Sequence, residues 1–304
     1  MIADDLAWLP APAQAAVAAT LGLVFGSFAN VCIHRIPEQR SVVWPGSCCP
    51  RCGARIAWYD NLPVVSWAIL RGRCRHCRAS IPVQYPLVEL LCAALVVGLW
   101  GIHGLSWRWA ALSYLAVSIV VLIPIDWRHG ILPDRVTLPG IAAGLAVSCV
   151  TEPGLFGSIR GSLVGALVPL GVRSLYMAYA TMRARRAIPE PPLEPADPGA
   201  IAGPPFEPPG DAGEEHADPQ REGMGLGDVK MLAMVGAFLG APGVMLTMLL
   251  GSTSGALYVI PLLATGRHSM KTPVPFGPFL GGGALVAAFW GERLIGWYLG
   301  LLGP

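Results

Sequence analysis

Long apolar stretches recur along almost the whole of this sequence, and they constrain its fold more than any other feature. A helix needs about 20 apolar residues to cross the hydrocarbon core of a bilayer. Only 13% of the 304 residues are charged, against about 25% in a typical soluble domain, so most of the surface must face something other than water. Candidate spans occupy residues 12–33, 86–103, 107–125, 136–151, 158–180, 229–241, 243–264 and 276–301.

This pattern predicts an all-α polytopic membrane protein with about eight transmembrane helices, because a backbone in lipid must satisfy its own hydrogen bonds. The sixth stretch is short, and Gly281-Gly282-Gly283 is expected to break the eighth. The 37 glycines suit such a bundle, since small residues let membrane helices pack closely. The start, from Met1 to Asp5, is acidic where a cleavable secretory signal is basic, so no such signal is expected.

Basic residues predict the orientation. The segment 34–78 is rich in arginine and contains only two acidic residues, so the positive-inside rule places it in the cytoplasm. The N-terminus is then expected outside. Counting eight spans from there brings further basic residues to the cytoplasmic side, namely Arg183, Arg185, Arg186, Arg267 and Lys271.

Composition divides the chain into five regions. Residues 188–222 are rich in proline and poor in apolar side chains, which predicts a flexible cytoplasmic linker, with a partner-binding role as the less favoured alternative. The predicted regions are a first transmembrane helix at 1–33, a cytoplasmic cysteine-bearing domain at 34–86, helices two to five at 87–182, a disordered linker at 183–223, and helices six to eight at 224–304.

Two Cys-x-x-Cys pairs lie in the arginine-rich loop. Cys49 and Cys52 form the first pair, and Cys74 and Cys77 form the second. Four thiolates at such spacing can enclose zinc in a tetrahedron, and a reducing cytoplasm disfavours disulfides. The pattern predicts a structural zinc site closing a small ribbon, with neighbouring arginines helping to keep the thiols deprotonated. The alternative is a set of free or redox thiols, and Cys48 and His76 are spare donors.

Two aspartates stand at the edges of apolar stretches. Asp126 follows the run that ends in Ile125, and Asp228 lies in Gly225-Leu226-Gly227-Asp228 at the start of a helix. The predicted topology puts both on the cytoplasmic side. Two carboxylates sharing a water can cleave a peptide bond without a metal, because their mutual repulsion keeps one protonated and one ionised. The sequence therefore predicts an aspartic peptidase.

Less specific interpretations of these acids exist. A single aspartate after a membrane helix is commonly an interfacial anchor or a helix cap. Asp134, after Pro133, is expected to be the N-cap of the next helix. Lys230 either influences Asp228 or extends toward lipid headgroups.

Several motifs together resemble the type IV prepilin peptidase family, the GxGD-type membrane aspartyl proteases. The match extends over nearly the whole chain, with Asp126 ahead of an Ile-Leu-Pro-Asp element and Asp228 within Gly-x-Gly-Asp-x-Lys. The proline-rich insert widens the gap between the two aspartates beyond the family pattern. The other matching segments are Gly26-Ser27-Phe28-Ala29-Asn30-Val31, His34-Arg35-Ile36-Pro37, Cys49-Pro50-Arg51-Cys52-Gly53, Asp60-Asn61-Leu62-Pro63-Val64-Val65-Ser66-Trp67 and Tyr85-Pro86-Leu87-Val88-Glu89.

The resemblance implies a bacterial inner-membrane enzyme that cuts the basic leader from prepilins and pseudopilins of type IV pilus and type II secretion systems. Cleavage would occur on the cytoplasmic side, with Asp126 and Asp228 as catalytic residues. It also implies N-methylation of the new N-terminal residue with S-adenosylmethionine, a second activity linked to the cysteine-bearing domain. Lipid and prepilins are the expected partners, nucleic acid is not, and the sequence leaves the oligomeric state and the methyl-donor residues open.

Two other classes remain as alternatives. In a transporter or channel, Asp126 and Asp228 would relay protons or bind a cation, although transport sites usually lie near the bilayer midplane. In a structural assembly factor, the zinc ribbon would dock a secretion partner and both aspartates would tolerate alanine.

Overall fold

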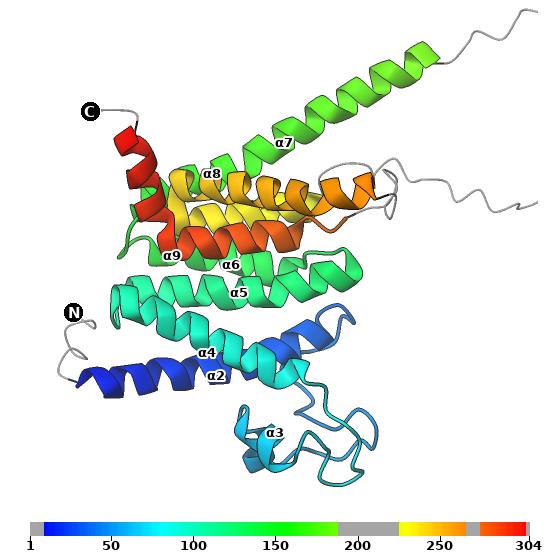
Figure 1. Ribbon diagram of the computed structural model, residues 1–304, viewed down its shortest axis with the longest axis vertical. Coiled ribbons are helices and arrows are strands. Elements are labelled where there is room, and N and C mark those ends of the chain that lie inside the picture. The colour runs from blue at the N-terminus through cyan, green and yellow to red at the C-terminus, as the bar shows by residue number, and fades with distance from the viewer. Residues whose placement is uncertain (1–8, 188–224, 266–273, 302–304) are drawn as a thin grey trace, which may run out of the picture.

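The computed structural model describes residues 9–187, 225–265 and 274–301, which form a bundle of long helices with one small insert (Figure 1). The described residues contain no β-strand, so the all-α prediction is confirmed. The bundle helices are α2 (Ala11–Arg35), α4 (Gln84–His103), α5 (Trp107–His129), α6 (Asp134–Val147), α7 (Gly154–Ala187), α8 (Leu226–Ala264) and α9 (Gly277–Leu301). The predicted linker at 188–222 lies outside the described residues, as do Arg267 and Lys271.

Five of the described helices are long and apolar enough to cross a membrane: α2, α4, α5, α7 over Gly154–Met182, and α8. With 14 residues, α6 is shorter than the usual span of about 20. The chain is a multi-pass membrane protein.

Helix α8 contains two crossings rather than one. Its 39 residues would extend about 58 Å if straight, nearly twice the hydrocarbon thickness of about 30 Å. At Gly240 the backbone leaves the helical region, with φ 69° and ψ −177°, and Pro242 follows. Figure 1 shows the chain reversing there, so that both ends of α8 point to the same end of the bundle. The break at Gly240 falls near the predicted boundary between spans 229–241 and 243–264, and with both halves of α8 counted the described part of the bundle has eight helical segments, roughly as predicted.

Glycines bring α7 and the first half of α8 into backbone contact. A Cβ added at Gly161 would lie 2.2 Å from the carbonyl oxygen of Gly236, and one at Gly165 would lie 2.3 Å from that of Leu232. No side chain fits between backbones this close. The packing is the small-residue type by which membrane helices associate without a hydrophobic driving force.

The glycine triplet of α9 does not break the helix, contrary to the sequence prediction. Helix α9 is continuous from Gly277 to Leu301. A Cβ at Gly281 would lie 2.8 Å from Ile123, and one at Gly283 would lie 2.8 Å from the carbonyl oxygen of Thr247. These glycines therefore allow close packing against α5 and α8, and that packing keeps the helix intact.

The bundle core surrounds α5 and the first half of α8. Twelve of the 23 residues of α5 are buried. A second cluster joins α2 and α4 to α5 at Ile125, directly before Asp126. The main cluster centres on fully buried side chains of α5, α8 and α9: Leu115, Ile119, Leu122, Met231, Leu232, Met234 and Leu280.

The insert connects α2 to α4. It contains a short 3₁₀ helix, η1 (Trp58–Asn61), and the one-turn helix α3 (Val65–Ile69). Isolated β-bridges join Cys48 to Arg55 and Arg73 to Ser80, so each Cys-x-x-Cys pair lies in its own tight hairpin. Figure 1 shows the insert beside α2 and α4, on the opposite side of the bundle from α7. This is the zinc-ribbon-like arrangement that the sequence predicts.

Candidate active site and metal centre

Asp126 lies in the last turn of α5, with only 6% of its surface exposed. Its Oδ2 accepts a hydrogen bond from the backbone N–H of Gly277, at 3.0 Å. Gly277 is the first residue of α9, whose unpaired N–H groups and dipole favour a negative group. The carboxylate is thus fixed at the junction of α5 and α9.

Gly277 is a site residue that the sequence analysis missed. A Cβ at this position would lie 2.6 Å from Oδ2 of Asp126, so a larger residue would displace the carboxylate or the start of α9. The available signal was Gly277-Pro278, a glycine followed by a proline, the residue favoured in the first turn of a helix. That signal marks a helix start but does not indicate a contact with residue 126.

Asp228 lies in the first turn of α8 and is 8% exposed. The preceding Gly227 packs against Leu132, since an added Cβ would lie 2.9 Å from the Cβ of Leu132. This contact seats the first turn of α8 on the connection between α5 and α6. The structure thereby brings Asp228 within electrostatic reach of Asp126, although 102 residues separate them in the chain.

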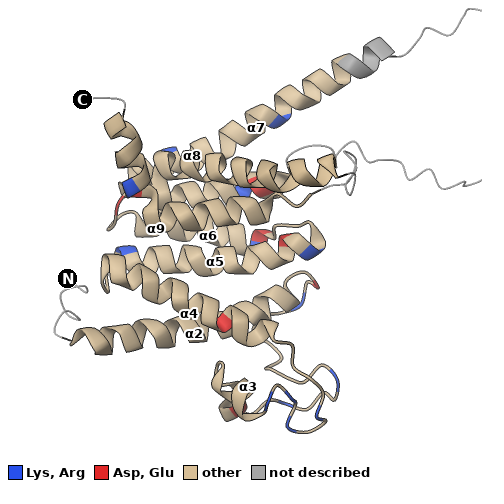
Figure 2. Ribbon diagram, viewed as in Figure 1, with Lys and Arg blue, Asp and Glu red and all other residues tan. Residues whose placement is uncertain are grey.

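Acidic residues concentrate where α5, α6 and α8 meet (Figure 2). Asp134 is the first residue of α6, and Pro133 is the N-cap, so the predicted capping role of Asp134 is wrong. Its Oδ1 instead accepts a hydrogen bond from Nζ of Lys230, at 2.6 Å, in an exposed ion pair between α6 and α8. Lys230 therefore pairs with Asp134 rather than with Asp228.

The four predicted cysteines come together in the insert. The Sγ atoms of Cys49, Cys52, Cys74 and Cys77 all lie within 4.8 Å of one another, and those of Cys49 and Cys77 are 3.8 Å apart. Sulfurs about 2.3 Å from a tetrahedral zinc are about 3.8 Å apart. This cluster can hold a metal ion, and Cys48 is not part of it.

Backbone amides favour the thiolate form in this cluster. The N–H groups of Cys52 and Arg51 lower the pKa of Cys49 to about 6. The N–H groups of Cys77 and His76 lower the pKa of Cys74 in the same way. The tight hairpins supply this effect, whereas the sequence analysis assigned it to neighbouring arginines.

Comparisons with known proteins agree with this architecture. Residues 20–102 match the bacterial peptidase A24 N-terminal domain, and residues 113–260 match the type IV leader peptidase family. The prepilin leader peptidase/N-methyltransferase of Burkholderia pseudomallei is 34% identical, over 93% of this chain and 87% of the relative. Proteins of the same name from Stutzerimonas stutzeri and Pseudomonas aeruginosa are 33% and 32% identical, each over 93% of this chain and 92% of the relative.

No solved structure matches the chain. Its fold and its site define a multi-pass membrane protein with a cysteine-bearing insert and with two buried aspartates in electrostatic reach of each other. Within that class, the chain belongs to the type IV leader peptidase family, and the resemblance seen in its motifs is confirmed.

Proposed function

We propose that this chain is a membrane aspartic endopeptidase that removes the leader peptide of prepilins and pseudopilins, and then methylates the new N-terminal residue with S-adenosylmethionine. The observation that carries the proposal is that Asp126 and Asp228, in end turns of α5 and α8, are both buried and lie within electrostatic reach of each other. Membership of the family supports it, as do the printed names of relatives that align over more than nine-tenths of the chain.

The two carboxylates are the catalytic residues in this proposal. One, ionised, accepts a proton from the attacking water, while the other, protonated, donates to the scissile carbonyl. The water oxygen bonds to the carbonyl carbon, the C–N bond breaks, and the amine leaves with a proton. The Gly277 N–H holds Asp126 in orientation, and burial of both acids limits competing bulk water.

The substrate fits the place of these acids in the bundle. A prepilin has a basic leader followed by an apolar helix, so the helix can lie in the membrane while the leader stays in the cytoplasm. Asp126 and Asp228 occupy helix ends, which favours cleavage at the membrane edge over proton relay at the midplane. The arginine-rich loop supports a cytoplasmic position for this end of the molecule in the bacterial inner membrane.

The insert completes the proposal. A structural zinc held by Cys49, Cys52, Cys74 and Cys77 would close it, and the separation of the Cys49 and Cys77 sulfurs supports zinc. Region 34–86 then serves the methyl transfer, and regions 1–33, 87–182 and 224–304 form the peptidase bundle. Of the predicted linker at 183–223, residues 183–187 continue α7 and the rest lies outside the described residues.

Conservative substitution of each aspartate tests the peptidase. Asp126→Asn and Asp228→Asn should each lower cleavage of a co-expressed prepilin at least about 1,000-fold, because an amide cannot accept the proton of the water. Asp134→Asn is the matched control, since Asp134 lies nearby but pairs with Lys230. Processing by either of the first two variants, measured by the mass of the pilin, would refute the catalytic pair.

A further inference from the structure

A cavity of about 640 Å³ lies between α2, α4 and the insert. Pockets for small molecules commonly measure about 300–1,000 Å³. Neither Asp126 nor Asp228 lines this cavity, so it is distinct from the peptidase site. The lining residues that matter here are Ser27, Asn30, His34, Trp67, Tyr85 and Glu89.

Two polar atoms of the cavity wall are buried without a hydrogen-bond partner among the described residues. Asn30 is 1% exposed, and its Nδ2 donates to the carbonyl of Tyr85 at 3.0 Å, while its Oδ1 has no donor. Nε2 of His34 is likewise unpaired, one helical turn further along α2. Buried polar groups in folded proteins nearly always have a partner, so these atoms point to a ligand with hydrogen-bonding groups.

Glu89 adds a buried carboxylate to the same cavity. It is 7% exposed, and its Oε2 accepts a hydrogen bond from the N–H of Val64 at 2.7 Å. It forms no ion pair within the part of the chain that the structure describes. A buried carboxylate is costly unless a cation or several donors compensate it.

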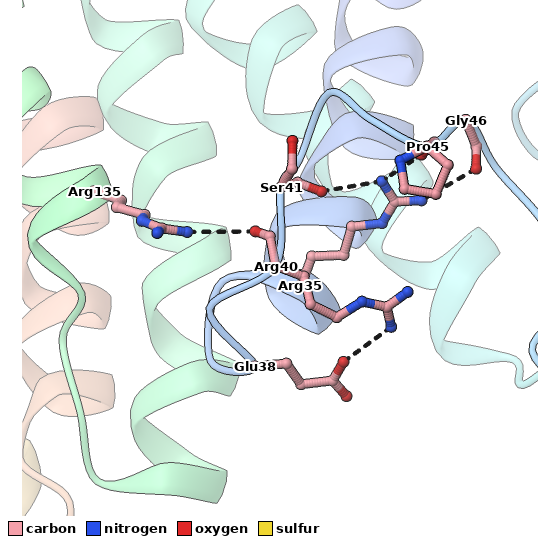
Figure 3. Close-up of polar contacts among 7 residues, drawn as sticks. All are labelled: Arg35, Glu38, Arg40, Ser41, Pro45, Gly46 and Arg135. Carbon is pink, nitrogen blue, oxygen red and sulfur yellow. Dashed lines mark hydrogen bonds and ion pairs between the residues drawn. The ribbon is translucent and has the colours of Figure 1, made fainter.

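Three of the five arginines that line the cavity have other partners. The guanidinium of Arg35 donates to the carbonyls of Ser41, Pro45 and Gly46, which fixes the loop after α2 (Figure 3). Arg75 forms a two-bond ion pair with Asp60. Arg40 pairs with Glu38. Arg51 and Arg55 also line the cavity, and none of the ion pairs among the described residues reaches Glu89, so a cationic ligand can supply its counter-charge.

We propose that this cavity binds S-adenosylmethionine, with Glu89 facing its positive charge and with Asn30 and His34 hydrogen-bonding its polar groups. The inference rests on the proposed methyl transfer and names the residues that would serve it. The donor combines cationic groups with a flat base, and the stacked rings of His34 and Tyr85, 5.3 Å apart and 16° from parallel, form an aromatic wall for that base.

Contacts also tie this cavity to the peptidase helices. Arg128, two residues after Asp126, donates to the side chain of Gln84, the first residue of α4. Arg135 of α6 donates to the carbonyl of Arg40 at 3.3 Å (Figure 3). The two sites thus share neighbouring elements, which suits an enzyme whose first product is the substrate of its second reaction.

Calorimetric titration of the purified full-length protein with S-adenosylmethionine tests the proposal. Glu89→Gln should weaken binding at least about tenfold, because it removes the buried charge and keeps the shape. Glu38→Gln is the matched control, since this exposed carboxylate at the rim pairs with Arg40, and it should change binding less than about threefold. No binding to the native protein, or equal losses in both variants, would overturn the proposal.

A second experiment distinguishes binding of S-adenosylmethionine, the methyl donor, from binding of the methyl acceptor, which is also a cation. A peptide with the N-terminal sequence of a mature pilin carries an ammonium group. If Glu89→Gln weakens binding of this peptide and leaves that of S-adenosylmethionine unchanged, the cavity takes the amine and the assignment is wrong. Titration needs no cleavage, so failure of the peptidase proposal would appear separately, as prepilin processing by Asp126→Asn or Asp228→Asn.

If Glu89→Gln does not fold, a cross-linking experiment on the native protein can still test whether the cavity binds S-adenosylmethionine. Ultraviolet cross-linking with an azido derivative of S-adenosylmethionine, followed by peptide mass spectrometry, should label residues 27–34 or 47–89. Competition by unlabelled donor should remove the label. Labelling confined to other segments would overturn the proposal.

Discussion

The helical bundle and the cysteine insert reach a defined structure by opposite means. In the bundle, large side chains such as Leu115 and Met231 are fully buried between helices. In the insert, Cys49 is the only buried apolar residue across positions 37–83, all of which the structure describes. A segment with so little buried apolar area needs cross-links, as small domains in general do. The cysteine cluster and the Asp60–Arg75 pair are the cross-links present.

Removal of the metal should reveal the largest difference between the two regions, because it should unfold the insert and leave the bundle folded. Cys49→Ser, or a chelator, is expected to release the bound metal and to unfold the insert, because the binding energy of a structural zinc is folding energy. The bundle should keep its helical content. Elemental analysis and limited proteolysis between 37 and 83 measure the two effects.

Cys48→Ser is the control for this experiment, since Cys48 adjoins the cluster without belonging to it. It should retain about one metal per chain. Loss of metal in Cys48→Ser would contradict the assignment of the four ligands. An insert that resists protease after metal removal would contradict the view that the metal stabilises it.

Gly277→Ala tests how finely the bundle positions Asp126, the proposed catalytic carboxylate. The new Cβ would lie 2.6 Å from Oδ2 of Asp126, so the carboxylate must move. Displacements of about 1 Å at a reacting group can cost about 100-fold in rate, and a comparable loss of prepilin cleavage is expected. Gly282→Ala, in the same helix but facing open space, should cleave normally. Equal rates for the two variants would argue against this positioning role.

Gly161→Ala probes close packing in the bundle away from either site. Its Cβ would lie 2.2 Å from the carbonyl oxygen of Gly236, and overpacking of this kind costs about 1–3 kcal/mol. Gly171→Ala, ten residues further along α7, meets nothing within 4 Å. Thermal denaturation in detergent should show a lower midpoint only for Gly161→Ala. An unchanged midpoint for Gly161→Ala would mean that α7 and α8 can move apart to accommodate the methyl group without loss of stability.

Lys230→Ala should have the smallest effect. The Lys230–Asp134 pair is exposed, with 37% and 54% of the side chains accessible, and such pairs contribute about 0–1 kcal/mol. Cleavage is expected to stay within about threefold of the native rate. A loss greater than tenfold would show that Lys230 acts on Asp228 after all.

The bundle helices are predicted well from the sequence, because an apolar segment that crosses a bilayer must have a length set by the bilayer thickness. The eight predicted spans correspond to the observed helices, including the division of α8 at Gly240. The glycine triplet of α9 was misjudged because its helix is stabilised by neighbours distant in the chain. Orientation, region boundaries and catalytic roles stay predictions.

At the site, sequence reasoning identified groups but not their partners. Asp126 and Asp228 were recognisable from charge beside apolar runs, and the four cysteines from their spacing. The N–H of Gly277 was not, because 151 residues separate it from Asp126 and a glycine carries no chemical signal. The same limit hid the pairing of Lys230 with Asp134.

The turn at Gly240 decides at which end of the bundle the following segments lie. Because the chain turns back there, the start of α2 and the end of α9 lie at the same end of the bundle (Figure 1). A chain that continued straight through this point would invert α9 and carry Gly277 to the end of the bundle opposite Asp126. The contact between the Asp126 carboxylate and the N–H of Gly277 thus depends on one residue with a positive φ, 37 positions away in the chain.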